Sequence, residues 1–262
     1  MPVNDKHVFI VVPARKNSKR LKNKNIKDFQ GFPLFEWSLA AAIFTKNTLN
    51  SLGLSNIEII CSSNEKKIIE IVIKKYSGRV SPVIRDENLS GDNITLESVI
   101  IQAAEEIANK KGFIKPGYGK FILLQPTSPI RAKKDLTEFC ERFTRVRKEF
   151  SLLSANENYR EFKDIYTLNE INNLDEFTWI VGKKVNKRGE NLKKSAFIDG
   201  SIYSGEIISL QRNSFIPANK TFVFLQSIPW SVDIDTKKNF DEAVDALYKF
   251  KNEGIEVVEP EI

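Results

Sequence analysis

Histidine, cysteine and long apolar runs are scarce in this chain of 262 residues. The single histidine, His7, excludes zinc sites built on histidine pairs and leaves one candidate for a Ser-His-Asp triad. Cys61 and Cys140 suit buried thiols in a reducing compartment better than a disulfide framework. No apolar run approaches the roughly 20 residues of a membrane span, and the first residues lack a signal-peptide pattern. We therefore expect a cytoplasmic protein without a membrane partner.

Charge, in contrast, is abundant. The 40 lysines and arginines outnumber the 34 acidic residues and give a net charge of +6, which indicates anionic partners. The cations are spread along the whole chain, and no run of five or six like charges marks a tail. This distribution favours small anionic molecules over nucleic acid.

The apolar residues alternate between strand and helix patterns over roughly the first 150 residues. We expect strands at 8–12, 57–62, 80–85, 121–124 and 152–154, and helices at 34–44, 64–76, 96–107 and 136–146. This order predicts a single α/β domain, with a mostly parallel sheet between helices. Short β-like segments at 164–168, 177–181, 201–209 and 221–225 then predict a small antiparallel insertion at about 160–210, and a last helix is expected at 240–248.

A basic loop, residues 13–25, follows the first predicted strand and is the first candidate site. Its arginines and lysines can surround a polyphosphate, because arginine offers a bidentate fork and lysine a mobile point charge. The loop is not a Walker loop, since no glycine lies between Pro13 and Gly31. The alternative interpretation is a solvated basic loop.

Residues 125–131 form the second candidate site, after the strand at 121–124. Two prolines fix the path of this segment and would hold Gln125 at the sheet edge, where its amide can recognise a base or a sugar. The alternative is an ordinary turn in which Thr127 or Ser128 caps the next helix.

A pair of carboxylates, Asp233 and Asp235, is the third candidate. Their alternate spacing in an extended segment turns both to the same side, where they can share a hard cation such as Mg²⁺. The alternative is that Asp235 or Thr236 caps the last helix.

Four segments, taken in order, resemble the acylneuraminate cytidylyltransferases, the CMP-sialic acid synthetase family: 13–25, 123–131, 199–203 and 232–236. The resemblance extends from Val8 to about Leu247. It implies a Rossmann-like nucleotidyltransferase fold whose insertion serves dimerisation, in a homodimer. It also implies transfer of CMP from CTP to the anomeric hydroxyl of a nonulosonic acid, with release of pyrophosphate and a requirement for Mg²⁺.

The same resemblance implies a role for individual residues. The nucleotide would be bound by Pro13, Ala14, Arg15, Ser18, Lys19, Lys24, Asn25, Arg85 and Thr95. The sugar would be bound by Gln125, Arg188, Asp199 and Tyr203. The metal would be held by Asp233 and Asp235, and the residues expected to be catalytic are Arg15, Lys24 and Asp235.

The chain departs from the family pattern near the expected sugar pocket. Asp199 stands where the family usually has asparagine, and Phe197-Ile198 replace the usual Arg-Pro. We therefore expect an acceptor other than N-acetylneuraminate, with a charged or amino-bearing nonulosonic acid pairing with Asp199. Trp179, Tyr203 and Trp230 are candidates for a sugar-facing wall, with core packing or a dimer interface as the alternative for each.

Two other functions remain possible from the sequence. One is a metal-dependent glycosyltransferase that uses an Asp-x-Asp motif on a nucleotide-sugar, although such a motif normally lies mid-chain. The other is a non-catalytic nucleotide-binding protein with the same fold.

Overall fold

The structure is a computed structural model. It describes residues 7–16, 18–91, 94–112, 119–146, 150–156, 165–170, 178–184, 195–212, 221–228 and 230–261.

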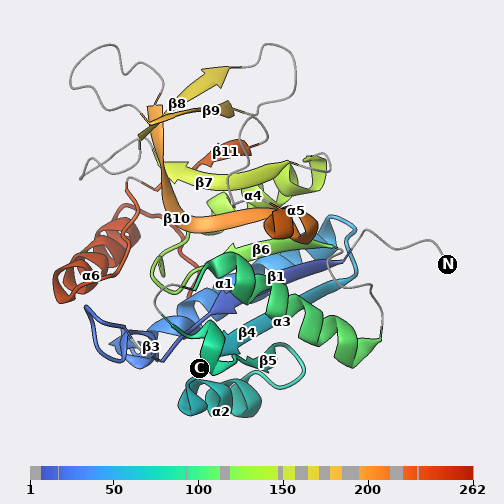
Figure 1. Ribbon diagram of the computed structural model, residues 1–262. Coiled ribbons are helices and arrows are strands. Elements are labelled where there is room, and N and C mark those ends of the chain that lie inside the picture. The colour runs from blue at the N-terminus through green and yellow to red at the C-terminus, as the bar shows by residue number, and fades with distance from the viewer. Residues whose placement is uncertain are drawn as a thin grey trace.

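A seven-stranded sheet forms the centre of the protein, and six of its strands run in the same direction (Figure 1). In spatial order these six are β5 (Ser81–Ile84), β4 (Ile57–Ser63), β1 (Val8–Pro13), β6 (Lys120–Leu124), β7 (Ser151–Asn156) and β11 (Thr221–Leu225). The long strand β10 (Ser195–Glu206) runs antiparallel between β6 and β7. The α/β fold with a mostly parallel sheet is thereby confirmed.

Two further strands, β9 (Thr178–Lys184) and β8 (Ile165–Glu170), extend this sheet beyond β11 in antiparallel order. The far end of β10 also pairs with β8, and Figure 1 shows β10 bending away from the central strands to reach it. The expected antiparallel region therefore exists as part of the same sheet. A separate two-stranded hairpin, β2 (Asp28–Phe29) and β3 (Phe32–Pro33), follows the basic loop.

Helices cover both faces of the sheet because β1 is apolar at every position. Ile10 and Val12 pack with α1 (Leu34–Ser51), α2 (Lys66–Lys75) and α4 (Lys133–Arg145). Phe9 and Val11 face the opposite side. That side is covered by α3 (Leu96–Lys111) and the short α5 (Ile207–Arg212). Successive strand residues point to opposite faces, so a run of apolar residues requires two apolar layers.

The last helix, α6 (Lys237–Asn252), packs over one edge of the fold against Leu34, Trp37 and Phe29. In Figure 1 it lies on the same side of the molecule as the loop that follows β1. The segment from Asp233 to Thr236 thus enters α6 at the carboxyl ends of the parallel strands, where open α/β sheets bind their ligands.

Two expectations in the second half of the chain were wrong in detail. The strand expected at 201–209 ends at Glu206, and Ile207 begins α5. Ile207 and Leu210, which are three residues apart, pack with the α3 side of the core, and this spacing is helical. The strand expected at 221–225 is present, but it pairs in parallel with β7 in the central sheet.

Cys61 and Cys140 are both buried and free, as expected. Among the described residues, no helix combines the length and the apolar character needed to cross a membrane.

Candidate active site

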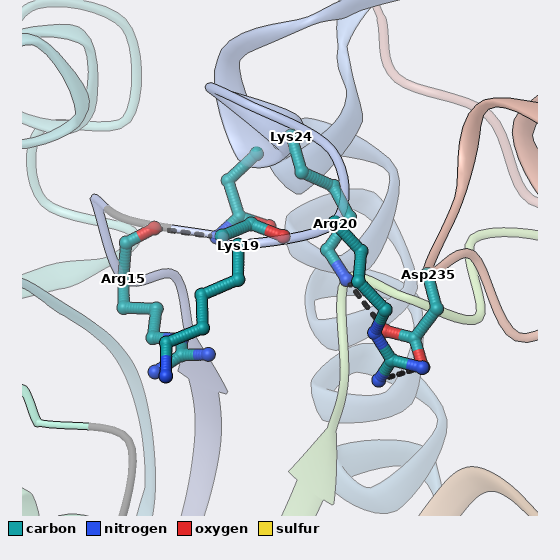
Figure 2. Close-up of a pocket in the computed structure, with 7 residues that line it drawn as sticks. Arg15, Lys19, Arg20, Lys24 and Asp235 are labelled. Carbon is teal, nitrogen blue, oxygen red and sulfur yellow. Dashed lines mark hydrogen bonds and ion pairs between the residues drawn. The ribbon is translucent and has the colours of Figure 1, made fainter.

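A cavity of about 220 Å³ lies at the carboxyl end of β1. It is lined by Arg15, Ser18, Lys19, Arg20, Lys24, Asn25 and Asp235. Figure 2 shows Arg15 and Lys19 side by side at one end, with Arg20 and Lys24 directed toward Asp235 at the other. Because four of the seven lining residues are cationic and one is anionic, the cavity is suited to a polyanion.

Hydrogen bonds within the basic loop give the cavity its shape. The Asn25 side-chain amide donates to the carbonyl oxygen of Arg15 over 2.8 Å, which closes the loop on itself. A short 3₁₀ turn, η1 (Lys24–Ile26), follows Asn23, whose φ of 57° is left-handed. A solvated loop would not need these internal bonds, so the loop is a structured part of the site.

Lys24 connects the basic loop to the carboxylate motif 211 residues away. Its ammonium donates to the carbonyl oxygen of Ile234 over 2.6 Å and to Asp235 Oδ1 over 3.2 Å. Arg20 forms an ion pair of 2.7 Å with Asp235 Oδ2. We did not single out Arg20 from the sequence, although it belongs to the basic loop, because only the fold brings it to Asp235.

The segment that contains Asp233 and Asp235 is held from two sides. Its Ile234 N–H donates to the carbonyl oxygen of Thr127 over 2.7 Å, which joins the second candidate segment to the third. Thr236 caps α6 through a capping box with Asn239, so the capping alternative is confirmed for Thr236 while Asp235 faces the cavity. The other capping alternative was wrong, because α4 begins after Ala132 without a side-chain cap.

Asp233 has an exposed side chain and is not among the residues that line the cavity. Loss of hydration nevertheless raises the pKa of its carboxyl above the ordinary value, and the charge of Asp235 adds to this effect. A hydrogen bond from the Thr127 side chain and the charges of Lys24 and Arg20 oppose it. Thr127 therefore contacts this segment through its side chain as well as its backbone.

The two carboxylates fit a magnesium site that a substrate completes. Mg²⁺ is usually held by one or two carboxylates together with substrate phosphates and water. Asp235 offers one such carboxylate at the cavity, and Asp233 lies two residues before it. Among the described residues, no group of three or more His, Cys, Asp or Glu could hold a metal by itself. A metal at this place would therefore complete its coordination with water and with phosphate oxygens of a bound nucleotide.

Arg85, the residue that follows β5, adds a further cation near Arg15. Its guanidinium donates to the carbonyl oxygen of Ser62 over 3.0 Å and to Ser62 Oγ over 3.3 Å. Burial lowers the pKa of Arg85 to about 10, Cys61 acts in the opposite direction, and the charge of Arg15 lowers it further. Arg15 and Arg85 thus lie close enough to repel each other, and an anion between them would relieve that repulsion.

Ala14 and Thr95 already have structural roles. Ala14 is buried between β1 and β4: its N–H donates to Ser62, and its carbonyl accepts from Ser63 Oγ. Thr95 Oγ1 accepts from the N–H of Ser98 and caps α3. Thr95 does not line the cationic cavity, and its predicted contact with the nucleotide stays a prediction.

Gln125 and Tyr203 lie together on the other side of the site, around a bend in β10. The bend is at Gly200, whose φ of +78° favours glycine, and the register of β10 against β7 shifts between Ile198 and Tyr203. Gln125 Nε2 donates to the Gly200 carbonyl oxygen over 3.2 Å. A Cβ at Gly200 would lie 3.7 Å from Gln125 Nε2, 3.9 Å from Tyr203 Oη and 4.0 Å from Ser128 Oγ.

Asp199 is buried beside this bend, and its carboxylate accepts hydrogen bonds from four groups. Oδ1 accepts from Ser154 Oγ and the Ser201 N–H, and Oδ2 accepts from Gln226 Nε2 and Ser231 Oγ. A direct ion pair with an amino group of the acceptor, as the sequence predicts, would have to displace one of these donors.

The structure says less about the other residues that the sequence places near the sugar, Arg188, Trp179 and Trp230. Arg188 lies outside the described residues, and the side chain of Trp179 is likewise not described. Trp230 packs edge-on against Phe250, with ring centroids 4.9 Å apart. This contact supports the core-packing interpretation of Trp230.

The fold and the site together define a nucleotidyltransferase of the α/β class, in which cations and a carboxylate pair meet at the strand ends. The chain belongs to the cytidylyltransferase family, whose model matches residues 9–256.

Two curated relatives match nearly their whole length. The pseudaminic acid cytidylyltransferase of Campylobacter jejuni is 32% identical over 93% of this chain and 97% of that protein. The CMP-N,N'-diacetyllegionaminic acid synthase of Legionella pneumophila is 26% identical over 87% of this chain and 91% of that protein. A solved CMP:2-keto-3-deoxy-manno-octonic acid synthetase complexed with CTP shares the fold, with a TM-score of 0.62 and 14% identity over 93% of this chain and 99% of that one.

Proposed function

We propose that this cytidylyltransferase transfers CMP from CTP to the anomeric hydroxyl of a nonulosonic acid. The observation that carries the proposal is the convergence of Arg15, Lys19, Arg20 and Lys24 with Asp235 on one cavity. The similarity to enzymes named for pseudaminic and legionaminic acids supports the class of acceptor. It also favours the expectation of an acceptor other than N-acetylneuraminate.

In the proposed reaction, an oxygen of the acceptor forms a bond to the α-phosphorus of CTP. The bond from that phosphorus to the β-phosphate oxygen breaks, pyrophosphate leaves, and the hydroxyl proton passes to solvent. Such a transfer needs positioning and charge neutralisation from the protein and no protein nucleophile. The single histidine is therefore no obstacle to this chemistry.

The residues of the site are proposed to contact different parts of the nucleotide and its metal ion. Arg15, Ser18, Lys19 and Lys24 would contact the triphosphate, while Asn25 fixes the loop through Arg15. Pro13 and Ala14 would approach the base, and Arg85 would add charge near Arg15. Asp233 and Asp235 would hold Mg²⁺, which when bound neutralises phosphate charge.

Gln125 and Tyr203 are proposed to contact the acceptor at the bend of β10. Their side chains flank Gly200, at the end of the central strands where the nucleotide cavity also opens. The absence of a side chain at Gly200 would let a sugar approach the backbone closely.

A homodimer that uses the region at about 160–210 stays a prediction, as does a cytoplasmic location. The antiparallel strands β8 and β9 extend beyond the central sheet and support the first of these. Light scattering after gel filtration of the wild-type chain would give the mass directly, and a mass of one chain would contradict the dimer.

The function is tested by pyrophosphate release from CTP with Mg²⁺ and a panel of acceptors. The panel holds pseudaminic acid, N,N'-diacetyllegionaminic acid, N-acetylneuraminic acid and 2-keto-3-deoxy-manno-octonic acid, with UTP and ATP as nucleotide controls. We expect release with CTP and one of the first two acids. Release that is equal with and without any acceptor would contradict the proposal.

A further inference from the structure

A single buried side chain, Arg131, connects the two backbone segments that form the acceptor side of the site. Its Nη2 donates to the carbonyl oxygen of Gln125 over 2.9 Å and to that of Ser201 over 2.8 Å. Gln125 directly follows β6, and Ser201 lies in the bend of β10. The guanidinium therefore fixes the distance between the end of one strand and the bend of its neighbour.

Ser38 of α1 hydrogen-bonds to both Arg131 and the Gln125 carbonyl. Arg131 Nη1 donates to Ser38 Oγ over 3.1 Å, and Ser38 Oγ donates to the Gln125 carbonyl oxygen over 3.1 Å. The Gln125 carbonyl oxygen thus accepts three hydrogen bonds, from Arg131, Ser38 and the Ser128 N–H, while its side-chain amide donates to Gly200. The side chain of Gln125 therefore bonds directly to the bend at Gly200. Its backbone carbonyl bonds to Arg131, which itself bonds to the bend at Ser201.

Asp199 holds the same bend as Arg131, because its Oδ1 accepts a hydrogen bond from the Ser201 N–H over 2.9 Å. Arg131 is 0% exposed and Asp199 is 5% exposed. Burial lowers the pKa of Arg131, and the nearby charge of Asp199 raises it again. A buried cation is destabilised when nearby negative charge is lost, so the charge of Asp199 supports Arg131 as well as the bend.

We propose that Arg131 and Asp199 are positioning residues that set the Gln125 side chain against the Gly200 bend and so determine the affinity for the acceptor without contacting it. This inference rests on the proposed function, in which Gln125 contacts the acceptor. It also gives the aspartate at position 199 a reason that differs from direct sugar recognition.

A small displacement of the Gln125 side chain is expected to have a large effect on the reaction. A displacement of about 1 Å in a positioning contact can cost on the order of 100-fold in rate. Arg131→Lys keeps the charge but cannot bond both carbonyls with one planar group. Asp199→Asn keeps the shape but leaves Arg131 without its counter-charge.

The kinetic test compares these two variants with Glu36→Gln. Glu36 is a matched control because it is also buried and accepts from Tyr76 and Lys75, on the α1–α2 side away from the bend. We expect both positioning variants to raise the KM for the acceptor about tenfold or more, with CTP affinity by calorimetry within about twofold of wild type. Glu36→Gln should lower the thermal midpoint and leave the acceptor KM unchanged.

Equal losses for CTP and acceptor that follow the thermal midpoint would overturn the inference, because they would show a purely structural role. If the charged pair proves necessary for folding, Ser38→Ala offers a milder test. It keeps both charges and removes one bond to Arg131, so the acceptor KM should rise a few-fold while CTP affinity stays the same.

A second readout does not depend on turnover. The side-chain amide of Gln125 gives a ¹⁵N resonance that can be assigned by its loss in Gln125→Glu. We expect this resonance to shift in Asp199→Asn and Arg131→Lys and to stay in place in Glu36→Gln. An unshifted resonance overturns the positioning role even if the wild-type protein turns over, whereas a wild-type protein without turnover overturns only the proposed function.

Discussion

The nucleotide side and the acceptor side of the site each contain an arginine and an aspartate, and the two sets differ in contact and in exposure to water. Arg20 and Asp235 form an ion pair, whereas Arg131 and Asp199 each hydrogen-bond to Ser201 in the bend of β10. The side chains of Arg20 and Asp235 are 64% and 32% exposed, whereas Arg131 and Asp199 are almost completely buried. An exposed ion pair contributes little stability and exchanges partners easily. Arg131 and Asp199 are instead held by hydrogen bonds to the bend, and a buried polar group that loses its hydrogen-bond partner is costly.

This difference predicts different roles for the two sides of the site. On the nucleotide side, a triphosphate can replace Asp235 as the partner of Arg20 and Lys24, and Asp235 is then available to a metal ion. On the acceptor side, the proposed function requires Arg131 and Asp199 to keep the backbone of Gln125 and the bend of β10 in place before the sugar arrives. The same residue types thus serve as ligands in one half and as scaffold in the other.

Removal of the carboxylate on the exchangeable side should have the largest effect. Asp235→Asn is expected to lower kcat by roughly 100- to 1,000-fold, because electrostatic stabilisation of the transferring phosphate depends on it. The measurement is pyrophosphate release at saturating CTP, acceptor and Mg²⁺. Asp241→Asn, which alters an exposed carboxylate paired with Lys237 on α6, is the control and should be unaffected. Near-normal kcat in Asp235→Asn would contradict the metal role.

Lys24→Met should weaken CTP binding by about 10- to 100-fold, because a buried lysine at a phosphate site makes charge-assisted hydrogen bonds. Loss of Lys24 also removes the bonds that hold Ile234 and Asp235 to the loop. Calorimetric titration with CTP measures the change. Lys22→Met alters an exposed lysine of the same loop and should leave the affinity near that of wild type. Equal effects of the two variants would mean that net charge alone attracts the nucleotide.

Arg20→Ala sharpens the comparison, because its two expected effects have opposite signs. Loss of the competing ion pair should tighten binding of Mn²⁺ to the nucleotide-free protein by about two- to fivefold, as expected for an exposed pair. The KM for CTP should rise by a similar factor. Electron paramagnetic resonance of free Mn²⁺ measures the first effect, and weaker metal binding in the variant would contradict the exchange of partners.

The cysteines should show the smallest response, because both lie in the closed core. Burial raises the pKa of Cys61 and of Cys140 to about 12, with Arg85 acting against the shift at Cys61. The thiolate is the reactive form, so a raised pKa leaves almost none of it at pH 8. We expect no reaction with an aromatic disulfide reagent in the native protein and reaction of both thiols in denaturant. Rapid labelling of either thiol in the native state would show that the core opens.

The sequence predicts much of the fold because local periodicity decides most of it. The strand at β1 and the helix α3 follow from apolar spacing alone, and the parallel order follows from their alternation. The start of α5 and the place of β11 in the central sheet did not follow, since short apolar segments fit helix and strand alike.

The site shows the same limit. The cationic loop and the two aspartates were recognisable as motifs, because residue type and order carry their chemistry. The contacts of Arg20 with Asp235, of Arg131 with Ser201 and of Asp199 with Ser231 were not predictable, since the two residues of each contact lie far apart along the chain. The sequence shows an aspartate at position 199. Only the folded structure shows that both of its carboxylate oxygens already accept hydrogen bonds from other residues of the protein.

The most direct test of the central claim is the identity of the product, followed by ³¹P NMR. Wild-type protein is incubated with CTP, Mg²⁺ and pseudaminic acid or N,N'-diacetyllegionaminic acid. We predict that the CTP signals are replaced by one phosphodiester resonance of a CMP-sugar together with an equal amount of pyrophosphate. Pyrophosphate or phosphate accompanied by free CMP or CDP, without a phosphodiester from any acceptor, would contradict the account.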